Sequence, residues 1–185
     1  MKWLKKKKET DNSYNYSTKI NVPASYSPQA FADVVERLNK LEVKNSQTQE
    51  PGSNLVFPDE VFATLPTIIQ RTILGVMLCY EHDFPDFCFW GMRKALIDAI
   101  RIRFLSDKKR KLLCDENGEA FSLPKMIERA KQRYISGQMA NDLTARVKVF
   151  GDTASHDYMA NLQKEEVPAI FDLLRIALAR MFYPN

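Results

Sequence analysis

The stretch LPTIIQRTILGVMLCYEHDFPDFCFWGMRKALIDAI, residues 65–100, predicts two long helices joined by a short turn. Apolar residues fill most positions as far as His82, which is typical of a helix that is buried on most sides. The residues at 83–85, Asp-Phe-Pro, break this helix, because proline cannot continue a helix but fits the first turn of a new one. A short connection makes neighbouring helices antiparallel, so this pair is expected to form the centre of the fold.

The second helix of the pair carries two kinds of residue at helical spacing. Its apolar side chains are expected to face the core, at Trp90, Leu96, Ile97, Ile100 and Phe104. Its basic side chains are expected to reach outward, at Arg93, Arg101 and Arg103.

Further helices are predicted on both sides of this pair. A short helix precedes Pro66, and the last helix begins near Lys164, since Pro168 fits only a first turn. Between them, a helix capped by Ser122 carries an apolar stripe that resumes after Gly137.

The region around Gly151 is predicted to separate two helices. Gly151 occupies the position of a glycine that ends a helix, and Asp152 is then placed to cap the next short turn. The scarcity of glycine and the long-period apolar pattern together favour an all-α bundle.

One segment departs from the helical pattern. Residues 112–121, LLCDENGEAF, place Asn117 and Gly118 between short arms that contain apolar residues, which is a strong signal for a β-hairpin. A two-stranded hairpin is marginally stable alone, so it is expected to lie against the helices. The predicted fold is therefore an all-α helical bundle with one small β-hairpin at about residues 112–121.

The N-terminal third has a different composition. Residues 1–26 are rich in Lys, Asn, Ser and Tyr with almost no aliphatic side chains, which predicts a disordered basic tail. Ser27 and Pro28 indicate the start of an isolated helix, and the polar residues 45–54 indicate a linker. The chain is thus expected to divide into a Lys-rich tail at 1–26, a helix plus linker at 27–54, and a helical domain at 55–185.

The cysteines and the hydropathy constrain the setting. Three cysteines in apolar or mixed surroundings argue against a disulfide framework and favour a reducing, cytoplasmic location. Cys79, His82 and Cys88 lack a fourth ligand at a suitable spacing, so neither a metal site nor a cofactor is predicted. No apolar run is long enough to span a membrane, and the charged start lacks the apolar segment of a signal peptide.

The net charge of +4 is unevenly distributed. Residues 1–8 contain five lysines, for which a solubilising role is the simpler interpretation. The segment RIRFLSDKKRK, residues 101–111, holds six basic residues and one acidic residue, which predicts a surface that faces phosphate. The predicted binding residues are Arg101, Arg103, Lys108, Lys109, Arg110 and Lys111.

The stretch KVFGDTASHD, residues 148–157, contains one of the two histidines. A histidine titrates near neutral pH, so His156 is a candidate general base or acid. The alternative is structural, because a histidine that follows a Gly-Asp break can hydrogen-bond a backbone carbonyl and fix the turn. The sequence leaves both interpretations open.

The order of these elements resembles a prokaryotic family catalogued as domain of unknown function 4145, which is similar to the wider HEPN group of helical nucleotide-binding domains. Residues 65–100 resemble the family's helix pair, with its Arg-x-x-Leu at residues 93–96. Residues 122–143 resemble its connecting helix, and residues 148–157 resemble its signature, Arg-x-apolar-Gly-Asn-x-Ala-Ala-His. The resemblance covers about residues 65–183.

Three positions match the signature, at Gly151, Ala154 and His156. Lys148 stands where the family has arginine, Asp152 where it has asparagine, and Ser155 where it has the second alanine. With Arg93 from the helix pair, Gly151 and Asp152 are the residues to which the resemblance gives a structural role.

Many HEPN domains are metal-independent endoribonucleases that place an arginine a few residues before a histidine, and a two-fold dimer brings two such pairs together. The resemblance therefore implies His156 as a catalytic residue and a homodimer as the assembly. This sequence has no arginine at that spacing. The basic residues nearest before His156 are Lys148 and Arg146, and a lysine lacks the bidentate fork that arginine offers to phosphate.

Two classes of function follow. In the first, a non-catalytic helical module binds RNA, DNA or a protein partner of a prokaryotic restriction or antiviral defence system, a setting that the resemblance implies. In the second, the protein is a metal-independent endoribonuclease, a toxin or defence RNase of the HEPN type, whose site is built on His156 with Lys148 or Arg146. The missing arginine favours the first, and the basic segment 101–111 argues against a purely structural dimer.

Overall fold

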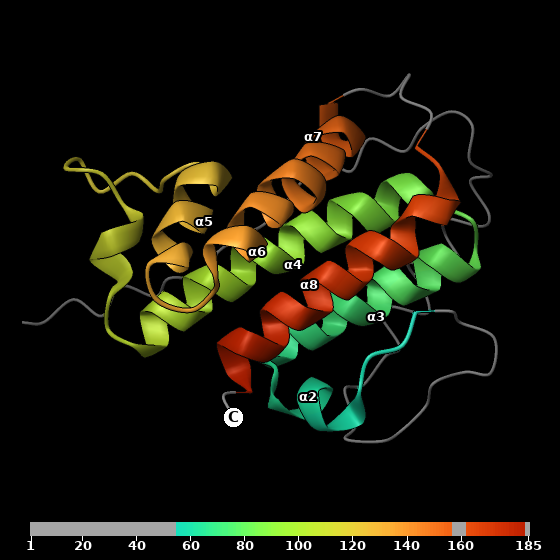
Figure 1. Ribbon diagram of the computed structural model, residues 1–185, viewed down its shortest axis with the longest axis horizontal. Coiled ribbons are helices and arrows are strands. Elements are labelled where there is room, and N and C mark those ends of the chain that lie inside the picture. Colours follow the sequence, from blue (N-terminus) through green and yellow to red (C-terminus); the bar gives the residue numbers. More distant parts are fainter. Residues whose placement is uncertain (1–54, 157–161, 184–185) are drawn as a thin grey trace, which may run out of the picture.

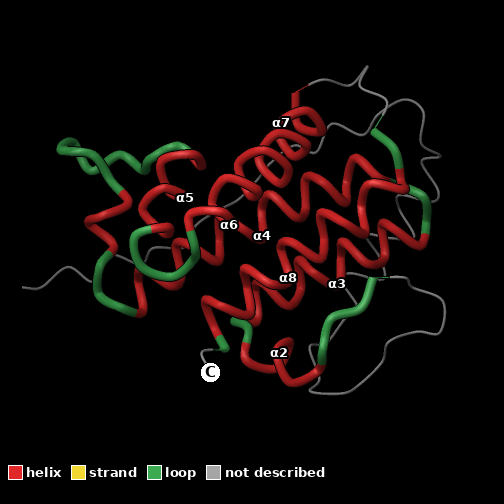
Figure 2. Tube along the Cα trace, in the orientation of Figure 1, coloured by secondary structure: helices red, strands yellow, loops and turns green. Residues whose placement is uncertain are grey.

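The computed structural model describes residues 55–156 and 162–183, apart from the side chain of His156. Over these residues the protein is all-α, as predicted, and contains no strand (Figures 1 and 2). The predictions of a tail at 1–26 and of a helix plus linker at 27–54 lie outside the described residues.

The predicted helix pair is present as α3 (Thr67–Glu81) and α4 (Pro85–Ser106). Pro85 stands in the first turn of α4, and Asp83 in the connection adopts a left-handed φ of 63°. The two helices pack closely at Gly91, because a Cβ atom there would lie 2.7 Å from Cγ2 of Val76. The absence of a side chain at residue 91 therefore sets the separation of the pair.

Helix α4 lies at the centre of the bundle and contacts α3, α7 (Val149–His156) and α8 (Val167–Phe182) (Figure 1). Leu96, Ile100 and Phe104 are fully buried, as the helical spacing predicts. Ile97 packs against the core from its edge, while Trp90 remains partly exposed.

One short helix completes the end of the bundle that contains the start of α3. Helix α2 (Asp59–Thr64) ends before Pro66, as predicted, and is held to α3 by the buried Gln70. The side-chain amide of Gln70 donates hydrogen bonds to the carbonyl oxygens of Phe62, at 3.1 Å, and Leu65, at 2.8 Å. The Phe62 carbonyl also accepts from the Leu65 N–H, so the buried amide of Gln70 adds a second bond there and joins the end of α2 to α3.

Helix α8 follows a 3₁₀ turn, η3 (Lys164–Glu166), and contains Pro168 in its first turn, as predicted. Six of its large apolar residues are buried within the same chain, at Val167, Ile170, Phe171, Leu174, Leu178 and Met181. Phe182 is partly buried and Ile176 is exposed, so the apolar area that α8 leaves for a homodimer is small.

The segment predicted as a hairpin contains no strands. A 3₁₀ turn, η1 (Arg110–Leu113), leads into one isolated antiparallel bridge between Cys114 and Ala120. Gly118 has the left-handed φ of 83° that the Asn-Gly signal requires, but the carboxylate of Asp115 accepts hydrogen bonds from the backbone N–H groups of Asn117 and Glu119. The side chain closes the turn locally, and the arms are too short to extend a ladder.

The prediction that Gly151 ends a helix is wrong. Helix α6 (Gly137–Asp142), a π-helical turn η2 (Leu143–Lys148) and α7 follow one another without a break, and Gly151 lies inside α7. Asp152 is therefore inside the helix and does not cap a new one. Gly151 is present for a different reason, which is its contact with α4.

Candidate functional site

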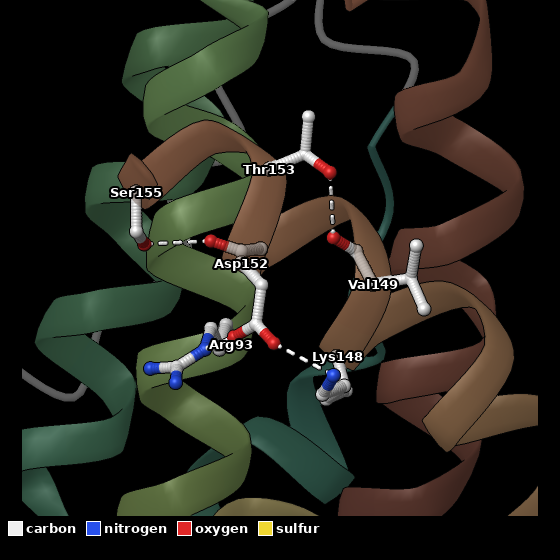
Figure 3. Close-up of polar contacts among 7 residues, drawn as sticks. Arg93, Lys148, Val149, Asp152, Thr153 and Ser155 are labelled. Carbon is white, nitrogen blue, oxygen red and sulfur yellow. Dashed lines mark hydrogen bonds and ion pairs between the residues drawn. The ribbon is translucent and has the colours of Figure 1, made fainter. Parts of the chain in front are cut away.

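Asp152 connects the signature segment, residues 148–157, to Arg93 of the helix pair. Its Oδ1 atom accepts a hydrogen bond of 2.6 Å from Nε of Arg93 on α4, and its Oδ2 atom lies 2.9 Å from Nζ of Lys148 at the end of η2. Figure 3 shows the two cations approaching the carboxylate from different helices. The prediction that Arg93 reaches outward is therefore wrong. Its side chain bridges α4 and α7 at a partly buried position.

This ion-pair cluster depends on the close approach of α4 and α7 at Gly151. A Cβ atom at Gly151 would lie 2.7 Å from Cδ of Arg93, 2.9 Å from its Cγ and closer still to its Cβ. The aliphatic part of Arg93 therefore occupies the space that any larger residue at 151 needs. Two hydroxyl groups, those of Thr153 and Ser155, donate to the carbonyl oxygens of Val149 and Gly151 along the same helix (Figure 3).

The charges in the cluster compensate one another. Partial burial raises the pKa of the Asp152 carboxyl, but the hydrogen bonds and charges of Lys148 and Arg93 outweigh that effect, and the net result is a lowered pKa. The carboxylate stays ionised and faces both cations. Lys148 is consequently committed to an ion pair within the chain and is a poor candidate for binding an incoming phosphate.

The other two residues proposed for catalysis are not brought into this cluster by any described contact. Arg146 is exposed and stands two residues before Lys148, a spacing that places it on another face of the helix. The backbone of His156 continues α7 one turn beyond Asp152, and its side chain lies outside the described residues.

The predicted phosphate-facing segment lies at the end of α4 and in η1, where a carboxylate organises it. Asp107 accepts a hydrogen bond of 2.6 Å from the Tyr134 hydroxyl and pairs with Lys109 at 3.5 Å and with Arg103 at 3.7 Å. The hydrogen bond from Tyr134, aided by the two cations, lowers the pKa of the Asp107 carboxyl. Burial and the bond to Asp107 raise the pKa of Tyr134 to about 12.

Two of the six predicted binding residues are occupied by this arrangement. The guanidinium of Arg103 lies over the ring of Tyr134, with its carbon 5.2 Å from the ring centroid, and its buried Nε makes no hydrogen bond within the described part of the chain. Lys109 is held by Asp107. The other four, Arg101, Lys108, Arg110 and Lys111, are exposed and form no ion pair with another described residue.

Sequence reasoning missed three residues near this segment. Tyr134 fixes the end of α4 from 27 positions away in the sequence. On α5 (Leu123–Lys131), Lys125 and Arg129 stand one turn apart and both lie over the ring of Phe121. The i,i+4 spacing of the two cations was visible in the sequence. Nothing in the sequence indicated that both of them contact the ring of Phe121.

Two of the three thiols occupy the core, and Cys114 is partly buried. Cys79 and Cys88 are buried, and Cys88 donates a weak hydrogen bond to the Val76 carbonyl at 3.4 Å. Burial raises the pKa of the Cys79 thiol to about 12 and moves that of Cys88 well above its ordinary value. Among the described residues, no three His, Cys, Asp or Glu side chains gather as metal ligands.

Within the same residues, no helix combines the length and the apolar character that crossing a membrane requires. Comparisons of the chain with protein-family models, with curated proteins and with solved structures found no match.

Proposed function

We propose that the protein is a non-catalytic helical module that binds nucleic acid through the end of its bundle formed by α4 and η1. The observation that carries this proposal is the group of four exposed cations, Arg101, Lys108, Arg110 and Lys111, which no described carboxylate neutralises. Asp107, the acidic residue of segment 101–111, is already held by Tyr134, Arg103 and Lys109. A basic surface of this kind attracts the phosphate groups of nucleic acids.

The setting of the proposal comes from the resemblance to the domain of unknown function 4145 and HEPN families. It is a cytoplasmic, prokaryotic restriction or antiviral defence system, with a homodimer as the assembly and a protein of that system as a further partner. The ion pairs of Asp152 with Lys148 and Arg93 support the non-catalytic form of the proposal, because they withdraw both cations from phosphate.

The proposal predicts that a triple variant with Lys108→Ala, Arg110→Ala and Lys111→Ala binds nucleic acid more weakly. Log affinity falls as log salt rises, and the loss of three phosphate contacts makes this fall less steep by about 3. Lys109 is kept, because it supports the turn, and alanine at 108 retains the Cβ atom at a φ of 58°, so backbone strain is unchanged. Fluorescence anisotropy with labelled RNA and DNA at several salt concentrations measures both quantities.

The matched control replaces three arginines on the other helices with alanine, at Arg71, Arg175 and Arg180. The control has the same net charge as the test variant and the same N-terminal lysines. Equal losses of affinity and slope in both variants would mean that binding depends on overall charge, and the proposed surface would be rejected.

The endoribonuclease alternative makes a different prediction. If His156 is catalytic, the natural protein cleaves RNA in the presence of EDTA, and His156→Ala abolishes cleavage while leaving the thermal midpoint nearly unchanged. We expect no metal-free cleavage, and a loss of about 1–3 kcal/mol of stability in the variant from an unsatisfied polar partner. Gel analysis of RNA products together with thermal unfolding of both proteins separates the two outcomes.

A further inference from the structure

The cations of segment 101–111 belong to a larger unit, residues 101–135, which we call the basic lobe. The lobe contains ten basic and five acidic residues and comprises the end of α4, η1, the bridged turn and α5 (Figure 1). The backbone N–H of Phe121 donates to the Leu113 carbonyl at 2.8 Å, which joins the start of α5 to the end of η1. The Tyr134–Asp107 hydrogen bond joins the segment after α5 to the end of α4.

A second pair of cations is fixed within this lobe. Nζ of Lys125 lies 3.7 Å from the centroid of the Phe121 ring, and the guanidinium carbon of Arg129 lies 5.9 Å from it. Cation–π contacts of this kind restrict flexible side chains and leave their charged ends able to donate to an anion. Since Phe121 is tied to η1, the pair is held in a fixed relation to Arg110 and Lys111.

The aromatic rings of the lobe are all engaged. Phe104 is fully buried, and its ring packs edge-to-face on Tyr134 at 5.1 Å. The ring of Tyr134 also makes a cation–π contact with Arg103. Phe121 packs against the core and makes a cation–π contact with Lys125. Proteins that bind single strands use exposed aromatic rings on which bases stack, whereas in residues 101–135, all of which are described, Phe104 is buried and Phe121 and Tyr134 are partly buried.

We infer that the basic lobe binds the phosphate backbone of a double-stranded nucleic acid, and that Lys125 and Arg129 on α5 are part of the contact surface. The inference rests on the proposed function and adds the class of ligand and the second helix. A duplex presents its phosphates at high density without requiring unstacked bases, which suits a surface that has fixed cations but no free ring. Recognition of this kind is insensitive to base sequence.

The lobe also contains exposed acidic residues. Asp115, Glu116 and Glu119 are exposed at the tip of the turn, and Glu128 pairs with Lys131 on α5. Glu116→Gln combined with Glu119→Gln should therefore increase affinity for a duplex, because it removes two negative charges beside the proposed phosphate contacts. This double variant removes acidic charge, so its expected effect is opposite to that of the alanine variants that remove basic charge.

The test uses the full chain with four labelled probes of equal length: an RNA duplex, a DNA duplex and one single strand of each. The expected result is binding to a duplex at least about tenfold tighter than to either single strand, and a salt slope reduced by about 2 in the double variant Lys125→Ala, Arg129→Ala. Phe121→Leu should weaken duplex binding without changing the slope, because it releases the cations but removes no charge. The two duplexes reveal whether the 2′-hydroxyl contributes.

Each other result has a distinct meaning. Single strands that bind as tightly as duplexes overturn the inference but leave the proposed function standing. Duplex binding that survives unchanged in the Lys125/Arg129 variant, while the Lys108/Arg110/Lys111 variant loses it, removes α5 from the surface. Binding to none of the four probes overturns the inference and the proposed function together.

Discussion

Replacing Gly151 with alanine is expected to lower the free energy of unfolding by about 1–3 kcal/mol, the usual cost of overpacking a close contact. The direction is opposite to helix propensity, which favours alanine over glycine by about 1 kcal/mol inside a helix. The added methyl group would lie 2.7 Å from Cδ of Arg93 and closer to its Cβ, which is fixed to the backbone of α4. Helices α4 and α7 must separate to admit it.

Chemical denaturation followed by circular dichroism measures this loss, and two further variants identify its cause. Gly137→Ala is the matched control, since the nearest atom there is Cε of Lys131 at 3.5 Å, and it should be neutral or stabilising. In an Arg93→Gly background the clash disappears, so Gly151→Ala should then cost much less. A loss that is equal in both backgrounds would show that contact with Arg93 is not the reason.

The helix order could be predicted because proline marks it. Pro66, Pro85 and Pro168 each stand at or just before a first helical turn, where the missing N–H is tolerated, and these local signals need no knowledge of the tertiary structure. The apolar spacing of α4 likewise identified its buried face, since α4 is packed against α3, α5, α7 and α8.

The role of Gly151 could not be predicted, because glycine serves two purposes that look alike in a sequence. One is a left-handed backbone at the end of a helix, and the other is close approach of a neighbouring element. The second applies here. The neighbour of Gly151 is Arg93, which also pairs with Asp152, 59 residues later in the chain. The resemblance grouped Arg93, Gly151 and Asp152, but gave no reason for their proximity.

The basic surface was only partly predictable for a related reason. Counting charges identified segment 101–111, but the sequence does not reveal which cations already have partners. Tyr134 holds Asp107 from a distant segment, and Asp107 in turn holds Arg103 and Lys109. The long-range hydrogen bond therefore decides which cations remain exposed, and short-range patterns carry no information about it.

Phe104 connects this surface to the core, and Phe104→Ala is expected to lower the free energy of unfolding by about 3–5 kcal/mol. The side chain is fully buried, and its ring supports Tyr134 edge-to-face at 5.1 Å. Such a loss is a large part of the 5–15 kcal/mol or so that stabilises a typical domain. Urea denaturation of the purified variant at low temperature, where it retains most of its fold, measures the loss.

Two conservative variants separate the ring from the hydrogen bond that it supports. Tyr134→Phe removes the bond to Asp107 but keeps the ring contact, and it should cost about 1 kcal/mol. Phe104→Leu keeps most of the buried volume and should cost less than about 1.5 kcal/mol. If Phe104→Ala proves no more costly than Tyr134→Phe, the ring is not the anchor of the basic lobe. The expected order instead makes packing at Phe104 the condition under which Tyr134 can hold Asp107 and leave the neighbouring cations exposed.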